Sequence, residues 1–466
     1  MVQCALSLLA LLLTTTVVFS QTYTFDLRQN YADGVYESGE TIIFSPRLLK
    51  DGEPVFDKGL RCILYLNGKE VSKKDFPAGE DVAYRTALDK PGWCHLAVIG
   101  LDSTGEPFNQ EVKGKSKQVR RYYGAIVAPL AIQVGAPEPS DFDAYWAKEK
   151  QKLEAIPHEA KRTAVLDVPE HLKTEYVEIP VGSGFRPVNA VVRMPANAEA
   201  KSLPIQLYVH GAGVRGPTNS TWAPWMPEAS GLKGHSLFMN LNAHGIPNDE
   251  SKEYYQALNE GELKNYPFLN SDDPEKFYMK GLVLRLIRAL EFLKAQPEWN
   301  GRDIVVRGGS QGGAQALIAG GIDPDVTFVY ADVPAMCDYG GTLVGRSSGW
   351  PRLYEQWPDG RLWLTTKRES REKLLASVEE IQHLGYFDAA NFARRIHGRA
   401  VLYTGGIDGT CPPTSVFAAY NNIPNDDKSI IFDPLAGHGR RSYEGDEAQN
   451  IAHFVGDRKL ADGDTP

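Results

Sequence analysis

Ser310 has the surroundings of a nucleophilic serine. It lies in the segment Gly-Gly-Ser-Gln-Gly-Gly, in which Gly308 and Gly312 take the two glycine positions of the pattern G-x-S-x-G. A β-branched run at 304–306 precedes this segment, and an Ala/Leu-rich run at 314–319 follows it. The pattern therefore predicts a sharp strand-to-helix turn that holds the serine hydroxyl clear of the backbone. A glycine-rich connecting turn without function is the alternative, which the flanking strand and helix disfavour.

A serine hydroxyl needs a base that accepts its proton and an acid that orients the base. Both residue types lie downstream, each after a hydrophobic run: Asp408 follows the run 400–407, and His438 lies in the loop after the run 429–433. The order serine, aspartate, histidine is the order of the α/β-hydrolases. We therefore predict Ser310, Asp408 and His438 as the catalytic residues. Taken singly, the aspartate could cap a helix, and the histidine could be a solvated loop residue.

Two backbone N–H groups are expected to bind the negative oxygen that develops during acyl transfer. Gln311 supplies the first, because it directly follows the serine. The second is assigned to Ala212, in a His-Gly-Ala-Gly loop that follows the strand-like run 205–209. His210 opens this loop and is interpreted as a structural residue, since in this fold the catalytic base comes after the nucleophile.

A further loop carries candidate substrate-binding groups. Asn242 and His244 follow an apolar run at 236–239, and they are predicted to line the acyl pocket or to bind a sugar. Ordinary hydrogen bonding within the loop is the alternative. The chain has no phosphate-binding glycine loop and no His/Asp/Glu cluster with the spacing of metal ligands. The predicted chemistry therefore requires no metal and no cofactor.

Length and composition predict a large globular protein. The 466 residues suggest two or three domains, and a hydrophobic content of 42% supplies ample core. A net charge of −9 argues against a general nucleic-acid surface and against strong attraction to anionic lipid. Residues 1–20 have the pattern of a signal peptide, with an apolar run too short to span a membrane. We therefore expect a secreted or periplasmic protein with no membrane association after cleavage.

Residues 21–128 are predicted to form a small immunoglobulin-like β-sandwich. Strand-like runs separated by turn signals lie at 22–27, 40–45, 60–66 and 93–101. A structural appendage is favoured over a carbohydrate-binding or positioning module, because a sandwich fold implies no function by itself. Cys62 and Cys94 have the parity of the apolar residues around them, so a disulfide and two buried thiols are equally open.

Residues 129–466 are predicted to form the catalytic domain. A helix capped by Ser140 runs to about residue 155, and strands and helices then alternate, as in a mostly parallel sheet flanked by helices. The expected strands are 177–181, 188–194 and 205–209, and the longest expected helix is 274–293. Residues 340–377, which mix tryptophans with charges, are a candidate insertion over the site. A surface excursion or a subunit contact is an equal alternative.

Residues 139–453 resemble the acetyl xylan esterase and cephalosporin C deacetylase family of α/β-hydrolases. The matching stretches are 140–146, 288–293, 308–313, 332–338, 385–393 and 408–421. The resemblance implies Ser310, Asp408 and His438 as the triad and Gln311 as an oxyanion donor. The chain departs from the family at Ala212, where a tyrosine is usual, and at 242–245, where an Arg-Gly-Gln segment is usual. These departures leave the fine specificity open. Family members typically lack the sandwich and often form hexamers, so the resemblance also suggests a homo-oligomer.

The function expected from these features is a carboxylester hydrolase that removes acetyl groups from xylan or acetylated oligosaccharides through an acyl-enzyme. A serine peptidase of the prolyl oligopeptidase type shares the elbow and the triad order. Its propeller needs ~40 residues per blade, and about 130 residues before the catalytic domain cannot build one. A non-catalytic carbohydrate-binding protein is the third hypothesis, and a complete triad in the right order argues against it.

Overall fold

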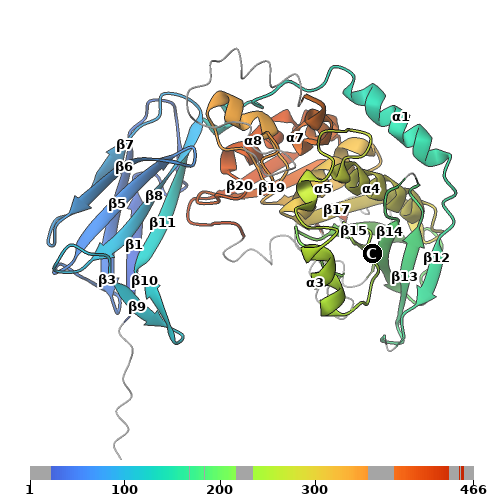
Figure 1. Ribbon diagram of the computed structural model, residues 1–466, viewed down its shortest axis with the longest axis horizontal. Helices are drawn as coiled ribbons and strands as arrows, with labels where there is room; N and C mark the ends of the chain where they lie inside the picture. The colour runs from blue at the N-terminus through green and yellow to red at the C-terminus, as the bar shows by residue number, and fades with distance from the viewer. Residues whose placement is uncertain are drawn as a thin grey trace, which may run out of the picture.

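The computed structural model describes residues 22–166, 168–182, 184–216, 235–354, 382–439, 451 and 453–455. The predicted signal peptide and residues 355–377 of the candidate insertion lie outside these residues. The described chain forms an all-β part at the N-terminus, at the left of Figure 1, and an α/β part beside it. Across the described ranges, no helix has both the length and the apolar character needed to cross a bilayer.

The all-β part consists of two packed sheets and a small hairpin. One sheet has the order β1-β3-β4, with β7 also paired to β3, and the other has the order β2-β11-β8-β5-β6. The hairpin is β9–β10. The strands are β1 (Tyr23–Gln29), β2 (Val35–Tyr36), β3 (Ile42–Lys50), β4 (Glu53–Pro54), β5 (Gly59–Leu66), β6 (Lys69–Phe76), β7 (Tyr84–Thr86), β8 (Gly92–Leu101), β9 (Asn109–Val112), β10 (Lys115–Gln118) and β11 (Arg120–Val127).

Alternating apolar residues build the core between these sheets. In β3, for example, Ile42, Phe44, Pro46 and Leu48 are buried while the residues between them are more exposed. The Phe44 ring packs edge-on against Tyr123 of β11 at a centroid distance of 4.7 Å, which joins the two sheets. The predicted all-β sandwich is confirmed.

Cys62 and Cys94 are buried free thiols. The strand register explains why they do not form a disulfide. Cys62 of β5 pairs with Val98 of β8, whereas Cys94 pairs with Leu66. The two cysteines therefore lie four residues apart along the ladder, roughly 13 Å at the rise of a β-strand, well beyond the reach of a disulfide.

The α/β part is built on a nine-stranded sheet with the order β12-β13-β14-β16-β15-β17-β18-β19-β20. The first four strands pair antiparallel, and from β16 onward all neighbours are parallel. The strands are β12 (Lys161–Ala164), β13 (Leu172–Ile179), β14 (Val188–Pro195), β15 (Leu203–Val209), β16 (Leu237–Leu241), β17 (Trp299–Gly309), β18 (Phe328–Asp332), β19 (Arg399–Gly405) and β20 (Lys428–Asp433). Because β15 to β20 are parallel, their carboxyl ends meet at one edge of the sheet.

Helices pack on this sheet. The α-helices are α1 (Phe142–Glu154), α3 (Lys252–Glu260), α4 (Tyr278–Lys294), α5 (Gln311–Ile322), α7 (Ala389–Phe392) and α8 (Pro413–Asn422), and the short 3-10 turns are η1 (Pro129–Ala131), η3 (Tyr266–Phe268), η4 (Tyr339–Val344), η5 (Gln382–Phe387) and η6 (Ala393–Arg395). The helix expected at 274–293 corresponds to α4, in which Leu282, Leu286 and Leu290 are buried. The predicted cap Ser140 is wrong: Asp141 holds that position, and its side chain makes no capping bond.

Candidate active site

Ser310 lies at the junction between β17 and α5, as the glycine pattern predicts. Its φ of 56° and ψ of −119° are unusual for a residue with a side chain, and such conformations cost about 1–3 kcal/mol. Two backbone hydrogen bonds hold the turn: the Ser310 N–H donates to the Asp332 carbonyl at 2.8 Å, and the Ser310 carbonyl accepts from the Ala335 N–H at 2.9 Å. The turn thus keeps the hydroxyl outside the helix that follows.

The glycines of the elbow allow the helix to approach β15 closely. A Cβ on Gly312 would lie 2.0 Å from the Val209 carbonyl oxygen, and one on Gly308 would lie 2.5 Å from the same atom. Since real Cβ atoms do not approach so closely, both positions require glycine. This contact brings Ser310 next to the loop that follows Val209, which is where the second oxyanion donor is expected.

His438 and Asp408 reach Ser310 from two other strand ends. The Ser310 Oγ lies 3.0 Å from His438 Nε2, and His438 Nδ1 lies 2.8 Å from Asp408 Oδ2. A carboxylate can only accept, so Nδ1 carries the proton and Nε2 is the acceptor for the serine hydroxyl. Asp408 follows β19, and His438 lies on the loop after β20. The three predicted residues therefore have the geometry of a Ser-His-Asp triad.

The Asp408 carboxylate is fixed by backbone donors on its other side. Its Oδ1 accepts the N–H groups of Thr410 at 2.8 Å and Cys411 at 2.9 Å, and the side chain is fully buried. These bonds occupy the oxygen that does not face His438. The alternative role of Asp408 as a helix cap is wrong, because α8 is capped at Pro412.

The pKa of His438 is raised above its ordinary value of 6.5. The hydrogen bond to Asp408 is the largest cause, burial acts in the opposite direction, and the negative charges of Asp408 and Asp332 raise the pKa further. The imidazolium is the form in which this histidine cannot accept the serine proton. Protonation of His438 therefore switches the base off.

We expect the acid limb of the kcat/KM profile for ester hydrolysis to lie above pH 6.5. Below this limb the rate should fall about tenfold per pH unit, because a single imidazolium must lose its proton before Ser310 can be activated. Initial rates with a neutral ester between pH 5 and 9 would measure this, with buffers matched in ionic strength. A limb at or below pH 6.5 would contradict the coupling between His438 and Asp408.

The two segments that hold the predicted oxyanion donors lie next to Ser310. Gln311 is the first residue of α5, so its N–H has no carbonyl partner within the helix. Its side chain is turned inward, where Oε1 accepts the Tyr266 hydroxyl at 2.6 Å. On the other side, a Cβ on Gly211 would lie 3.6 Å from Ser310 Cβ, so the loop that holds Ala212 passes directly beside the serine.

His210 is buried under this loop, and burial lowers its pKa to about 4. It therefore stays neutral and fits the structural role predicted for it.

Asn242 and His244 lie beneath the 211–215 loop, and both are completely buried. The Asn242 amide donates to the Arg215 carbonyl at 3.1 Å, while His244 Nε2 lies 3.2 Å from the Gly213 carbonyl. His244 Nδ1 lies 2.6 Å from the Tyr278 hydroxyl. Neither side chain reaches the surface of the site. This placement fits a support for the oxyanion loop better than the predicted contact with substrate.

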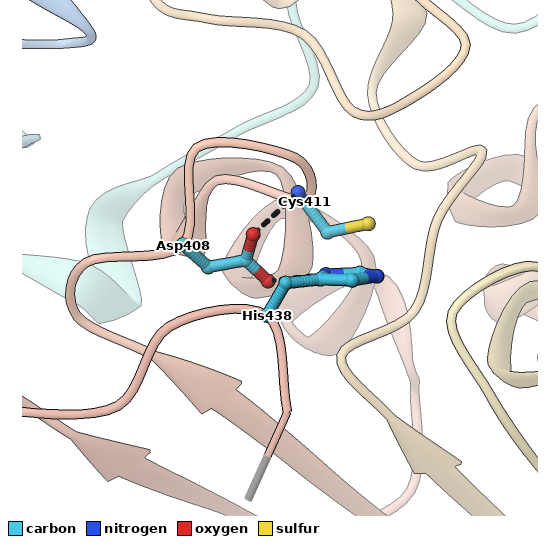
Figure 2. Close-up of side chains that lie close together, drawn as sticks. All are labelled: Asp408, Cys411 and His438. Carbon is cyan, nitrogen blue, oxygen red and sulfur yellow. Dashed lines mark hydrogen bonds and ion pairs between the residues drawn. The ribbon is translucent and has the colours of Figure 1, made fainter. Parts of the chain in front are cut away.

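Cys411 is the residue of the site that sequence reasoning missed. Its ligand atom and those of Asp408 and His438 lie within 4.8 Å of one another, and Figure 2 shows the thiol and the imidazole pointing the same way. A tetrahedral zinc ion would need its nitrogen and oxygen ligands roughly 3.3 Å apart. Nδ1 and Oδ2 are only 2.8 Å apart and share a proton. We therefore interpret the cluster as a hydrogen-bonded pair beside a thiol.

The Cys411 thiol remains protonated. Burial is the largest cause that raises its pKa well above the usual value, and the charge of Asp408 adds to it. A hydrogen bond with Ser310 acts in the opposite direction. The spacing Asp-Gly-Thr-Cys was the available signal: because the loop turns back on Asp408, its third following residue lies beside the triad.

A serine, an aspartate and a histidine at the carboxyl ends of β17, β19 and β20, in this chain order, define an α/β-hydrolase. The family model for acetyl xylan esterases (AXE1) matches residues 133–454. The chain therefore belongs to the acetyl xylan esterase family and is a serine carboxylesterase.

Individual relatives agree with this assignment. The acetyl esterase Axe7A of Xylanibacter ruminicola is 24% identical over 412 residues, which cover 86% of this chain and 84% of that protein. The acetyl xylan esterase of Paenibacillus sp. R4 superposes with a TM-score of 0.56 at 24% identity, covering 70% of this chain and 98% of that structure. Acetyl xylan esterase 1 of Thermoanaerobacterium sp. JW/SL YS485 gives 0.56 at 22%, covering 70% and 97%. At these identities the solved structures establish the α/β-hydrolase fold.

Proposed function

We propose that this protein is a secreted deacetylase that removes acetyl groups from xylan or from short acetylated oligosaccharides. The contact that carries the proposal is the hydrogen-bonded line from Ser310 Oγ to His438 Nε2 and from Nδ1 to Asp408. Membership of the acetyl xylan esterase family supports the acyl group and the sugar. The names of the relatives, acetyl esterase and acetyl xylan esterase, point to the same substrate class.

The reaction would run through an acyl-enzyme. Ser310 Oγ attacks the acetyl carbonyl while His438 Nε2 accepts the hydroxyl proton, and the carbonyl oxygen becomes negative. The N–H groups of Gln311 and Ala212 then bind that oxygen. His438 returns the proton to the sugar oxygen, which leaves as a free hydroxyl. A water molecule, deprotonated by the same imidazole, attacks the acetyl-serine, and acetate leaves as Ser310 regains its proton.

The acid of the triad would act on orientation and charge. Asp408 accepts the Nδ1 proton and so holds His438 in the tautomer whose Nε2 faces Ser310. When the imidazole becomes an imidazolium in the transition state, the same carboxylate stabilises its positive charge. Because Asp408 is buried, this interaction is screened only weakly by solvent.

Secretion is part of the proposal, and the apolar run before residue 21 supports it. A polymeric substrate such as xylan also requires an enzyme outside the cell. The expected result is a mature N-terminus at Gln21 in the culture fluid or periplasm, which N-terminal sequencing would identify. An N-terminus at Met1 in the cytoplasmic fraction would refute this part alone.

A substrate comparison tests the function itself. We expect the wild-type protein to release acetate from p-nitrophenyl acetate and from acetylated xylo-oligosaccharides, and to leave a proline-containing peptide intact. Acetate release measured enzymatically, alongside peptide cleavage measured by mass spectrometry, separates the outcomes. Peptide cleavage without acetate release would replace the proposal by a peptidase of the prolyl oligopeptidase type. Turnover of p-nitrophenyl acetate without turnover of the acetylated sugar would refute the carbohydrate substrate and keep the esterase.

A further inference from the structure

Trp93 connects the N-terminal sandwich to the loop that carries the catalytic acid. It lies at the start of β8, is 1% exposed, and its Nε1–H donates to the Gly406 carbonyl at 2.5 Å. Gly406 is two residues before Asp408. A stack of rings supports the indole from behind: His95 lies 4.9 Å from Trp93, and Tyr65 lies 4.6 Å from His95. The indole is therefore held rigidly where it meets the acid loop.

Gly124 makes the matching connection to the loop of the catalytic base. It lies on β11, the neighbour of β8, and its N–H donates to the Pro434 carbonyl at 2.7 Å. Pro434 is four residues before His438. A Cβ on Gly124 would lie 2.0 Å from the Gly406 carbonyl oxygen, so this strand also touches the acid loop. Leu435 packs against the core of the sandwich. β8 thus contacts the acid loop, and its neighbour β11 contacts both the acid loop and the base loop.

The acid loop and the base loop also pack directly on each other. The Gly406 N–H donates to the Asp433 carbonyl at 2.7 Å, and the Ile407 N–H donates to the Ala436 carbonyl at 2.9 Å. A Cβ on Gly405 would lie 2.4 Å from the same Ala436 oxygen. Because the two loops are in close contact, a shift of the acid loop would disturb its packing against the base loop. The distance between Asp408 and His438 depends on that packing.

We propose that β8 and β11 of the N-terminal sandwich position the acid and base of the active site, with Trp93 as the positioning residue that holds the Asp408 loop against the His438 loop. The sandwich is then a working part of the esterase rather than the appendage favoured from sequence. The inference rests on the proposed function, because it assigns Asp408 and His438 their roles.

The position of Trp93 predicts an effect on turnover rather than on substrate binding. In Trp93→Phe a ring remains in the interface, and only the donor to Gly406 is lost. We expect kcat for p-nitrophenyl acetate to fall about 10-fold, less than the ~100-fold cost of a 1 Å misplacement. KM should stay within twofold.

The acid limb of the pH profile should also move in Trp93→Phe. The titratable groups that face His438 are Asp408, Asp332 and the Cys411 thiol. Asp408 and Cys411 both lie on the loop that Trp93 holds, and of the two only Asp408 accepts a hydrogen bond from His438. If that loop shifts, the hydrogen bond from His438 weakens, and we expect the acid limb to move to lower pH.

Ser347→Ala is the matched control. The Ser347 Oγ–H donates to the Asn67 carbonyl at 2.7 Å, so this variant also removes one hydrogen bond between the sandwich and the α/β part. Ser347 lies after η4 and belongs to neither catalytic loop. We expect its kcat and its acid limb to match the wild type, whatever happens to the melting temperature. An equal loss of kcat in both variants would overturn the proposal, and so would wild-type behaviour of Trp93→Phe.

Gly124→Ala provides a second variant, should Trp93→Phe fail to fold. Its new methyl group pushes on Gly406 from the neighbouring strand, so the same fall in kcat and the same shift of the limb are expected; an unchanged kcat would refute the proposal.

Labelling of Ser310 by a fluorophosphonate separates this test from the proposed function, because labelling needs the triad but no natural substrate. If the wild type labels but hydrolyses no ester, the function fails, and slower labelling of Trp93→Phe still supports the positioning role.

Discussion

Replacing Ser310 with alanine is expected to lower kcat for p-nitrophenyl acetate by roughly 10⁶-fold, the cost of removing a triad serine. The reason is chemical, since the variant keeps the elbow and the oxyanion donors but has no oxygen to form the acyl-enzyme. Initial rates and mass spectrometry after mixing with a slow ester would measure both the turnover and the missing acetyl adduct.

Ser348→Ala is the control for this substitution. Ser348 is a buried serine outside the triad, and its Oγ–H donates to the Tyr339 carbonyl at 3.0 Å. Loss of that bond should cost about 1 kcal/mol of stability. We expect its ester hydrolysis to stay close to that of the wild type. If Ser310→Ala kept more than a tenth of the wild-type rate, the nucleophile would have to be another group, and the assignment of Ser310 would fail.

Asp408→Asn should lower kcat by about 10⁴-fold. Asparagine has the same shape, and its oxygen can still accept the Thr410 and Cys411 N–H groups. Its amide then donates toward His438 Nδ1, so the imidazole moves its proton to Nε2 and can no longer accept the proton of Ser310. The acid limb should also move to lower pH, because the hydrogen bond to Asp408 is the largest cause that raises the pKa of His438.

Asp338→Asn separates this effect from the general cost of altering a buried carboxylate. Asp338 is 1% exposed, pairs with Arg346 at 2.8 Å and accepts the Gly135 N–H at 2.6 Å. We expect lower thermal stability in this variant, with the acid limb and kcat close to wild type. If Asp408→Asn retained kcat within tenfold of the wild type, the orienting acid would lie elsewhere.

The triad could be predicted from sequence because each member follows a recognisable local pattern. The glycines around Ser310 are required by the approach to β15, and the runs before Asp408 and His438 are strands of the parallel sheet. The order of the three residues in the chain was then enough to predict the triad, because the loops that follow parallel strands lie at one edge of the sheet. The strand register of the sandwich keeps Cys62 and Cys94 apart, and the sequence around either cysteine does not indicate that register.

Other parts of the site depend on contacts between distant segments. Nothing around Asn242 or His244 in the sequence says that the 211–215 loop covers them, so their polar character suggested substrate contacts. Trp93 and Gly406 are 313 residues apart in the chain, and a tryptophan in an apolar strand is ordinary core material. The contact between Trp93 and Gly406 becomes evident only in the folded structure, in which the sandwich lies beside the α/β part.

The four described cysteines are buried thiols, two in each part of the molecule: Cys62 and Cys94 in the sandwich, Cys337 and Cys411 in the segments that follow β18 and β19. No covalent crosslink among them holds the described chain together, so reducing agents should leave it intact. Each thiol is also a built-in reporter of local opening. The order in which a small alkylating reagent modifies the two pairs would reveal which part of the molecule opens first.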